Sequence, residues 1–167
     1  YNKRVGITRI HIEEDAGKLI HEPGATRIDC NRCGVPLIEI VTEPDFRSAG
    51  EVHAFLTHLR AVLLYANVSN CRMEEGSMRC DVNLSLRPSP DAPFGTRTET
   101  KNIASLSATV RAIEYERIRH RKILEKGGAI TQDTLRWDDE RGVNYAMRSK
   151  EDAHDYFYFP EPDIMPI

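Results

Sequence analysis

A short and almost uninterrupted apolar run at residues 35–41 constrains the fold more than any other stretch of the chain. It lies between Gly34 and the turn-forming residues 43–45, and its length and composition predict a β-strand that is buried on both faces. Glu39 stands in the middle of this run. A carboxylate there loses water, so a cation, hydrogen bonds or a proton must compensate it. An ion pair with a nearby arginine, or an edge strand facing solvent, is the simpler explanation.

A second predicted strand, at residues 5–14, ends in acidic residues. Side chains alternate between the two faces of a strand, so Glu14 shares a face with Ile10 and Ile12, and His11 lies on the other face. Two carboxylates from separate strands, Glu14 and Glu39, can hold a hard cation such as Mg²⁺, which takes one or two carboxylates together with water and phosphate oxygens. A charged strand end that faces solvent is the alternative.

The composition is that of a globular protein with one core. The chain has 167 residues, of which 40% are hydrophobic and 29% are charged, and this length suffices for one domain. It contains neither an apolar stretch of about 20 residues, as a membrane span needs, nor a signal peptide. The net charge of −3 does not require a nucleic-acid partner, and the basic run at 117–122 is explained as a solvated helix end. Tyr1 stands where a complete chain has Met, so we expect a piece of a longer protein.

The four cysteines do not form the pattern of a structural zinc site. Cys30 and Cys33 make a Cys-x-x-Cys pair, but eight residues separate Cys71 from Cys80, whereas zinc sites normally use two tight pairs. Cys80 also alternates with apolar residues, as a core side chain does. A catalytic redox pair is equally disfavoured, because no thioredoxin-like βαβ pattern surrounds the first two cysteines.

Two helices and several strands complete the predicted elements. A capping box of Ser48 and Glu51 begins a helix with an apolar stripe that extends to Ala66, and a second helix runs from Ser105 to about residue 126, before two glycines. Strands are predicted at residues 26–29, 77–87, 96–103, 131–137 and 143–148, and an aromatic strand is predicted in the segment 155–163. No phosphate-binding loop, dinucleotide fingerprint or Gly-x-Ser-x-Gly nucleophile motif is present.

Charged residues alternate along the strands at 77–87 and 96–103, which a proline-rich turn joins. If these strands pair as a hairpin, their polar faces coincide. The chain has no phosphate loop, so if it binds a nucleotide, a sheet face of carboxylates and basic residues that hold Mg²⁺-nucleotide is the alternative design. A solvated face of ordinary ion pairs is the alternative. The residues expected on or beside this face are Arg79, Asp81, Arg97, Glu99, Lys101 and Arg148.

The string from Ile28 to Ile40 resembles the signature of the B subunit of aspartyl/glutamyl-tRNA amidotransferase, an Asp-x-Asn-Arg-x-Gly-x-Pro-Leu-Ile-Glu pattern. The resemblance covers the whole chain, with further matching strings in the family's order at residues 8–18, 73–81, 97–102 and 159–163. Cys30 and Cys33 occupy variable positions of the signature. The chain departs from the family pattern at residues 104–106, where Ala-Ser-Leu replaces Asn-Ser-Phe, and at Phe157, where the family has Arg.

The resemblance implies an α+β fold with a mostly antiparallel sheet and helices packed on one face, similar to the cradle of glutamine synthetase and guanidino kinases. Residues 1–167 would be a single catalytic domain, incomplete at both ends relative to the family. The implied enzyme is a ligase that uses ATP and Mg²⁺ to phosphorylate the side-chain carboxylate of Glu or Asp on misacylated tRNA. Ammonia that a partner amidase releases from glutamine then gives Gln-tRNA or Asn-tRNA.

The resemblance also implies roles for particular residues and partners. Glu14 and Glu39 match metal ligands, and His11 lies near the metal by motif. Lys101, on the charged sheet face described above, is the third catalytic candidate. A further Glu-x-His ligand motif of the family lies outside this segment. The implied partners are the amidase (the A subunit), the small C subunit and misacylated tRNA, in a bacterial cytoplasm or an organelle and without a membrane. The alternative is a non-catalytic scaffold that docks tRNA and the amidase.

Overall fold

The structure is a computed structural model that describes residues 2–149. Contacts divide the chain after Arg47 into two compact units. The strand predicted in the segment 155–163, and the departure at Phe157, lie outside the described residues. Neither described helix is long and apolar enough to cross a membrane.

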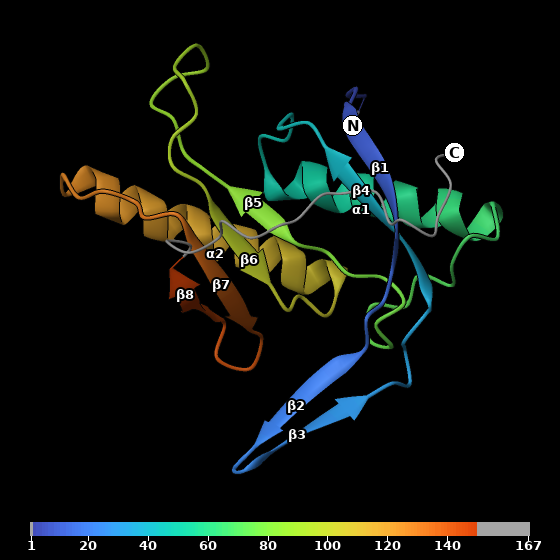
Figure 1. Cartoon of the computed structure of the whole chain (residues 1–167). Helices are drawn as coiled ribbons and strands as arrows, with labels where there is room; N and C mark the ends of the chain where they lie inside the picture. Colours follow the sequence, from blue (N-terminus) through green and yellow to red (C-terminus); the bar gives the residue numbers. More distant parts are fainter. Residues whose placement is uncertain (1, 150–167) are drawn as a thin grey trace, which may run out of the picture. The chain divides into compact units, whose positions relative to one another are not determined.

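The first unit consists of two antiparallel ribbons. Strand β1 (Ile7–Glu14) pairs with β4 (Pro36–Thr42), and β2 (Lys18–Glu22) pairs with β3 (Ala25–Asp29), as Figure 1 shows. The predicted strands that correspond to β1, β3 and β4 are confirmed. The sequence analysis missed β2, although it is as long as β3, its partner in the ribbon.

The prediction that the strand at 35–41 is buried on both faces is wrong for this chain. Among the described residues, β4 pairs with β1 in a sheet of two strands. The Glu39 side chain is 49% exposed, and Ile38 is 43% exposed. A continuous apolar run predicts a buried strand only where neighbouring strands or helices are present to bury it.

The second unit begins with helix α1 (Ala49–Tyr65), and helix α2 (Leu106–Glu125) follows later in the chain. The Ser48 hydroxyl caps α1 by accepting from the Glu51 N–H at 3.2 Å, and the Ser105 hydroxyl caps α2 in the same way. Such caps satisfy backbone N–H groups that have no partner inside the helix. Both predicted helices are therefore confirmed, and they contact each other.

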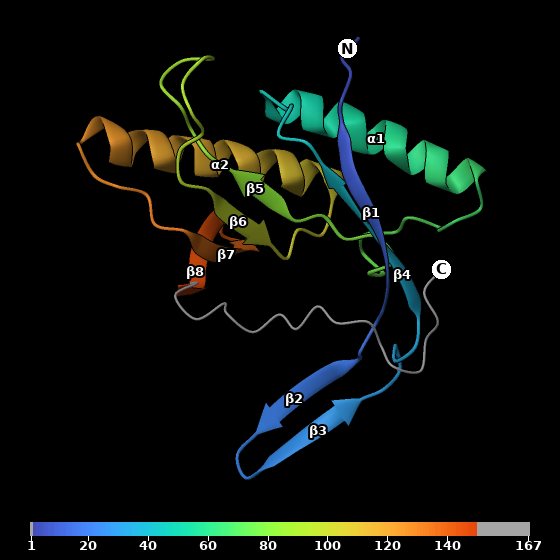
Figure 2. The ribbon, with the colours of Figure 1, turned by 45° about the horizontal axis from the view of Figure 1, so that its top comes forward.

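A four-stranded sheet completes the second unit. Its strands lie in the order β5 (Val82–Leu84), β6 (Thr98–Lys101), β7 (Asp133–Asp138) and β8 (Val143–Ser149). The pairs β5–β6 and β7–β8 are antiparallel, whereas β6 and β7 are parallel because α2 connects them as a crossover. Figure 2 shows both helices on the same side of this sheet. The predicted α+β class, with helices on one face of a mostly antiparallel sheet, is confirmed.

The core of the second unit lies between this sheet and α2. Trp137 of β7 is 1% exposed and packs with Ile103, Ala108 and Ala112, and its ring meets Tyr115 edge to face at 6.2 Å between centroids. Side chains alternate along β6 and β7, so the residues next to these buried ones face away from α2. The strand predicted at 77–87 shortens to the three residues of β5. One face of the sheet is therefore a core, and the other face is left for polar side chains.

Candidate functional site

Lys101 is the centre of a charged cluster on the face of the sheet that points away from α2. Its Nζ lies 2.8 Å from Asp81 Oδ2 and 3.3 Å from Glu99 Oε1. The antiparallel pairing of β5 and β6 brings these residues together, because Glu99 pairs with Asn83 and the neighbouring positions follow in register. The prediction that the two polar faces coincide is confirmed for these three charged side chains.

The charges around Lys101 keep it protonated. Burial alone would lower the pKa of this ammonium, but its hydrogen bond and attraction to Asp81, together with those to Glu99, outweigh burial and raise the pKa. The side chain is 43% exposed, so an incoming group can reach it. A fixed, accessible cation of this kind can bind a phosphate or carboxylate but cannot act as a base at neutral pH.

A buried polar network under the same strand holds the sheet against α2. The Thr98 hydroxyl donates a hydrogen bond to Glu116 Oε1 at 2.7 Å. The Glu116 carboxylate also accepts hydrogen bonds from Arg119 Nη2 at 2.6 Å and from the Asn144 amide at 3.0 Å. His120 Nε2 lies 3.1 Å from Glu116 Oε1. Burial alone would raise the pKa of Glu116, but hydrogen bonds from His120, Arg119, Asn144 and Thr98 outweigh it and hold the pKa well below its usual range. The network fixes the strand that carries Lys101 on its other face.

The sequence analysis missed two residues of this face. Arg136 pairs with Lys101 in the parallel register of β6 and β7, and Thr134 pairs with Glu99. The Thr134 hydroxyl donates to Glu99 Oε2 at 3.2 Å. Both residues alternate with the buried Leu135, and this alternation was visible in the sequence. The parallel pairing that places them beside β6 was not.

The remaining basic candidates are less closely defined by the sheet. Arg79 and Arg97 are exposed and precede the first residues of β5 and β6, so strand pairing does not place them on the face of Lys101. Arg148 belongs to β8, where its backbone pairs with Thr134 at the end of the sheet. A role for these three arginines stays a prediction.

The β1–β4 ribbon of the first unit brings together His11 and Glu39. These residues lie directly opposite each other, and His11 Nδ1 is 3.9 Å from Glu39 Oε2. Arg9 Nη2 approaches the same oxygen at 4.0 Å. Glu14 pairs with Pro36, three positions along the strand from His11, and alternation therefore places it on the other face of the ribbon. The structure does not bring Glu14 and Glu39 to one face.

This arrangement limits how the ribbon can hold a divalent cation. Carboxylate oxygens are the ligands that Mg²⁺ prefers, and one or two suffice when water and phosphate oxygens complete the site. Among residues 2–149, no group of three or more His, Cys, Asp or Glu side chains is placed to hold a metal. Glu39 or Glu14 fits Mg²⁺ as a single protein ligand, whereas one ion held by both does not follow from the pairing. Joint ligation therefore stays a prediction.

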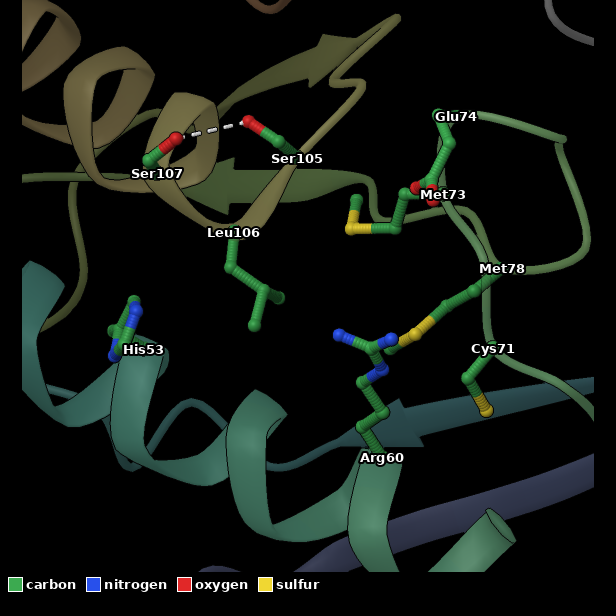
Figure 3. A pocket seen from close by; sticks show the side chains of 9 residues that line it. All are labelled: His53, Arg60, Cys71, Met73, Glu74, Met78, Ser105, Leu106 and Ser107. Carbon is green, nitrogen blue, oxygen red and sulfur yellow. Dashed lines mark hydrogen bonds between the residues drawn. The ribbon is translucent and has the colours of Figure 1, made fainter.

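A cavity of about 330 Å³ in the second unit lies away from the predicted residues. Its walls come from α1, the segment 71–78 and the first residues of α2. Figure 3 shows the Arg60 guanidinium pointing into it beside Met78, with Leu106 nearby and His53 at its far side. None of the candidate site residues that the sequence analysis named lines this cavity.

Comparison with known proteins places the chain in a family. All 167 residues match the family described as the GatB/GatE catalytic domain. The B subunit of aspartyl/glutamyl-tRNA(Asn/Gln) amidotransferase from Caldicellulosiruptor bescii is 60% identical over 167 residues, which are 99% of this chain and 35% of that protein. The protein of the same name from Lachnoclostridium phytofermentans is 58% identical with the same coverage. The chain thus spans about a third of the length of these relatives. It belongs to the GatB/GatE catalytic domain family.

Proposed function

We propose that this chain is the catalytic segment of a B subunit in an ATP-dependent tRNA amidotransferase. ATP phosphorylates the side-chain carboxylate of Glu or Asp on misacylated tRNA, and ammonia from glutamine then displaces the phosphate to form the amide. The observation that carries the proposal is the match of all 167 residues to a catalytic-domain family. The names of the relatives, which are B subunits of a tRNA amidotransferase, supply the reaction class.

The charged cluster around Lys101 gives the proposal its chemistry. A carboxylate is a poor acyl donor, so it needs a leaving group, and the transferred phosphoryl group carries negative charge that fixed cations stabilise. We assign to Lys101 the role of stabilising that negative charge. Asp81 and Glu99 are positioning residues that hold its ammonium group in place. Arg136 is a second cation of the same face. Arg79, Arg97 and Arg148 are proposed to contact ATP.

The ribbon residues are proposed to face the metal of this reaction. Bound Mg²⁺ would neutralise charge on the phosphate oxygens. Glu39 supplies one carboxylate oxygen on the face of the ribbon that it shares with His11. Glu14, at the end of β1, lies on the other face of the ribbon and is proposed as a separate candidate ligand rather than as a second ligand of the same ion.

The proposed partners follow from the reaction. The relatives are named as B subunits, which indicates an enzyme of several different chains. An amidase, the A subunit, is needed because the reaction consumes ammonia, and the family resemblance adds a small C subunit and the misacylated tRNA. The Lys101 side chain is 43% exposed, so an aminoacyl end can approach it.

The test uses the complete amidotransferase with Lys101→Met in this segment. The change keeps most of the length of the side chain and removes the charge, so we expect kcat for ATP-dependent amidation to fall about 100-fold. Hydrolysis of glutamine by the amidase should stay close to normal. Lys122→Met is the matched control, because Lys122 is an exposed lysine in the last turn of α2, and its amidation rate should be unchanged.

Two outcomes would contradict this proposal. If amidation per folded molecule is unchanged in Lys101→Met, the cluster is a structural set of ion pairs. If the wild-type complex does not consume ATP when it amidates tRNA, no phosphorylation step occurs and the proposed reaction is wrong. Thermal unfolding of each variant separates loss of chemistry from loss of fold.

A further inference from the structure

Lys101, Arg136 and Tyr145 form one row across three neighbouring strands of the four-stranded sheet. Lys101 of β6 pairs with Arg136 of β7 in the parallel register, and Arg136 pairs with Tyr145 of β8 in the antiparallel register. Residues that pair directly across strands carry their side chains on the same face of the sheet. Two cations and an aromatic ring therefore follow one another along this row.

The row lies on the face of the sheet that points away from α2. The amide of Asn144, the neighbour of Tyr145, donates to Glu116 of α2 at 3.0 Å, so alternation places Tyr145 on the opposite face. Trp137, the neighbour of Arg136, is 1% exposed in the core beside α2. In contrast, Tyr145 is 45% exposed, and Arg136 is exposed as well. A ligand can therefore reach both side chains.

The fold of the described residues does not use the side chains of Arg136 and Tyr145. Within residues 2–149, no hydrogen bond or ion pair engages the Arg136 guanidinium, and no ring contact engages Tyr145. Two arginines of α2 differ, because Arg111 pairs with Asp139 and Arg119 pairs with a buried carboxylate. A guanidinium and an exposed ring beside a lysine can bind a phosphate and stack on a nucleic-acid base.

The spacing along the row suits the end of an aminoacylated RNA. Neighbouring strands lie about 4.8 Å apart, so the backbone of Tyr145 is about 10 Å from the backbone of Lys101. In an aminoacylated RNA, the ribose separates the terminal base from the amino acid. A base that stacks on Tyr145 therefore places the ribose and its phosphate beside Arg136 and the amino acid toward Lys101.

The two sides of Lys101 differ in charge. Its ammonium group contacts the carboxylates of Asp81 and Glu99, whereas its neighbour on β7 is the cation Arg136. Carboxylates suit a nucleotide that carries Mg²⁺, and a cation followed by an aromatic ring suits single-stranded RNA. Phosphoryl transfer is roughly in line, so the donor and the acceptor approach from opposite sides. This asymmetry favours the RNA on the side of β7 and β8.

We propose that Arg136 and Tyr145 bind the terminal nucleotide of the misacylated tRNA. The Tyr145 ring stacks on its base, and the Arg136 guanidinium binds its phosphate. This assignment rests on the proposed function, which supplies misacylated tRNA as the substrate. It adds two residues that hold the RNA end to the lysine that acts on the transferred group.

Kinetics of the complete amidotransferase test the ring. In Tyr145→Ala, we expect KM for misacylated tRNA to rise about tenfold because one stacking contact is lost, while kcat and KM for ATP stay near their wild-type values. Tyr145→Phe keeps the ring, so it should keep the wild-type KM. Tyr65→Ala is the matched control, because Tyr65 is 96% exposed at the end of α1, and its KM should not change.

Binding without catalysis tests the same contact independently of the reaction. The probes are uncharged tRNA and the same tRNA without its 3′-terminal nucleotide. In the wild-type complex, removal of this nucleotide should weaken binding about tenfold, whereas Tyr145→Ala should bind the two RNAs equally. In Arg136→Gln, the slope of log Kd against log salt concentration should fall by about one, which corresponds to one lost phosphate contact.

Two results would overturn the assignment. One is an equal response of wild type and Tyr145→Ala to removal of the terminal nucleotide. The other is a rise in KM for ATP, instead of KM for tRNA, in Tyr145→Ala, which would give the row to the nucleotide. If the binding results are as expected but the wild-type complex amidates tRNA without consuming ATP, the RNA site stands and the proposed reaction is wrong.

Discussion

The β1–β4 ribbon and the four-stranded sheet position their charged residues by different means. In the ribbon, Glu39 meets Arg9 and His11 at 4.0 and 3.9 Å, and all three side chains are about half exposed. In the sheet, Lys101 meets Asp81 at 2.8 Å, and the other side of its strand is completely buried at Thr98. Both regions carry their candidate residues on paired strands, and in the sheet the helix α2 packs on the opposite face.

The difference shows what a second layer contributes to a site. Thr98 cannot move without breaking its hydrogen bonds to Glu116 and His120. These bonds therefore fix the position of the strand that carries Lys101 relative to α2. A two-stranded ribbon is marginal when nothing covers it, and its side chains keep more rotamer freedom. The geometry of the described residues accordingly defines the lysine cluster more closely than the carboxylates.

Removing the charge of Glu116 should cause the largest loss of stability among the variants that compare the sheet with the ribbon. Glu116→Gln leaves Arg119 and His120 beside a neutral amide in a buried position, and we expect the free energy of unfolding to fall by about 3 kcal/mol. The measurement is urea denaturation at neutral pH. Glu114→Gln is the control, because Glu114 makes a partly exposed ion pair with Arg117 on the same helix, whose loss should cost less than about 1 kcal/mol. Equal losses in both variants would mean that the network does not support the sheet.

Acid should weaken the sheet through the same carboxylate. The pKa of Glu116 is lower in the folded protein than in the unfolded chain, so its contribution to stability is fully present above the unfolded pKa of about 4.3. That contribution is lost as the pH falls through the folded pKa. We expect the difference in unfolding free energy between wild type and Glu116→Gln to shrink steadily below about pH 4. A difference that does not change with pH would contradict the assigned ionisation of Glu116.

Local patterns in the sequence predicted the elements well where one chain segment holds all the information. The caps at Ser48 and Ser105, the end of α2 before Gly127, and the β7–β8 hairpin all follow from spacings of a few residues. The parallel pairing of β6 with β7 joins strands on either side of α2, so no local pattern reveals it. The apolar run at 35–41 was over-interpreted for the same reason, since burial depends on neighbours that a strand's own sequence does not specify.

The residues of the candidate site were likewise predicted where they depend on local patterns and missed where they depend on long-range pairing. Alternation and the proline-rich turn were enough to predict that Asp81, Glu99 and Lys101 share a face, because β5 and β6 are consecutive strands. Arg136 was missed because its place beside Lys101 depends on the crossover through α2. For the carboxylates, the sequence supplied two correct strands but no register. The register pairs Glu39 with His11 rather than placing it on the face of Glu14.

The smallest expected effect on stability comes from substituting Glu39. Its comparison with Glu116→Gln contrasts a carboxylate of the ribbon with a carboxylate under the sheet. Glu39→Gln removes only long, half-exposed ion pairs, so we expect the free energy of unfolding to change by less than about 0.5 kcal/mol. If Glu39 binds a divalent cation, the same change should weaken Mn²⁺ binding by at least about tenfold, as isothermal titration of the full-length protein can measure. Glu13→Gln is the matched control, because Glu13 lies two positions from His11 on the same face of β1 and pairs with Leu37 instead of a charged residue. Equal Mn²⁺ affinity in wild type and Glu39→Gln would remove Glu39 from the metal site, and a large loss of stability would show that the ribbon depends on this carboxylate as the sheet depends on Glu116.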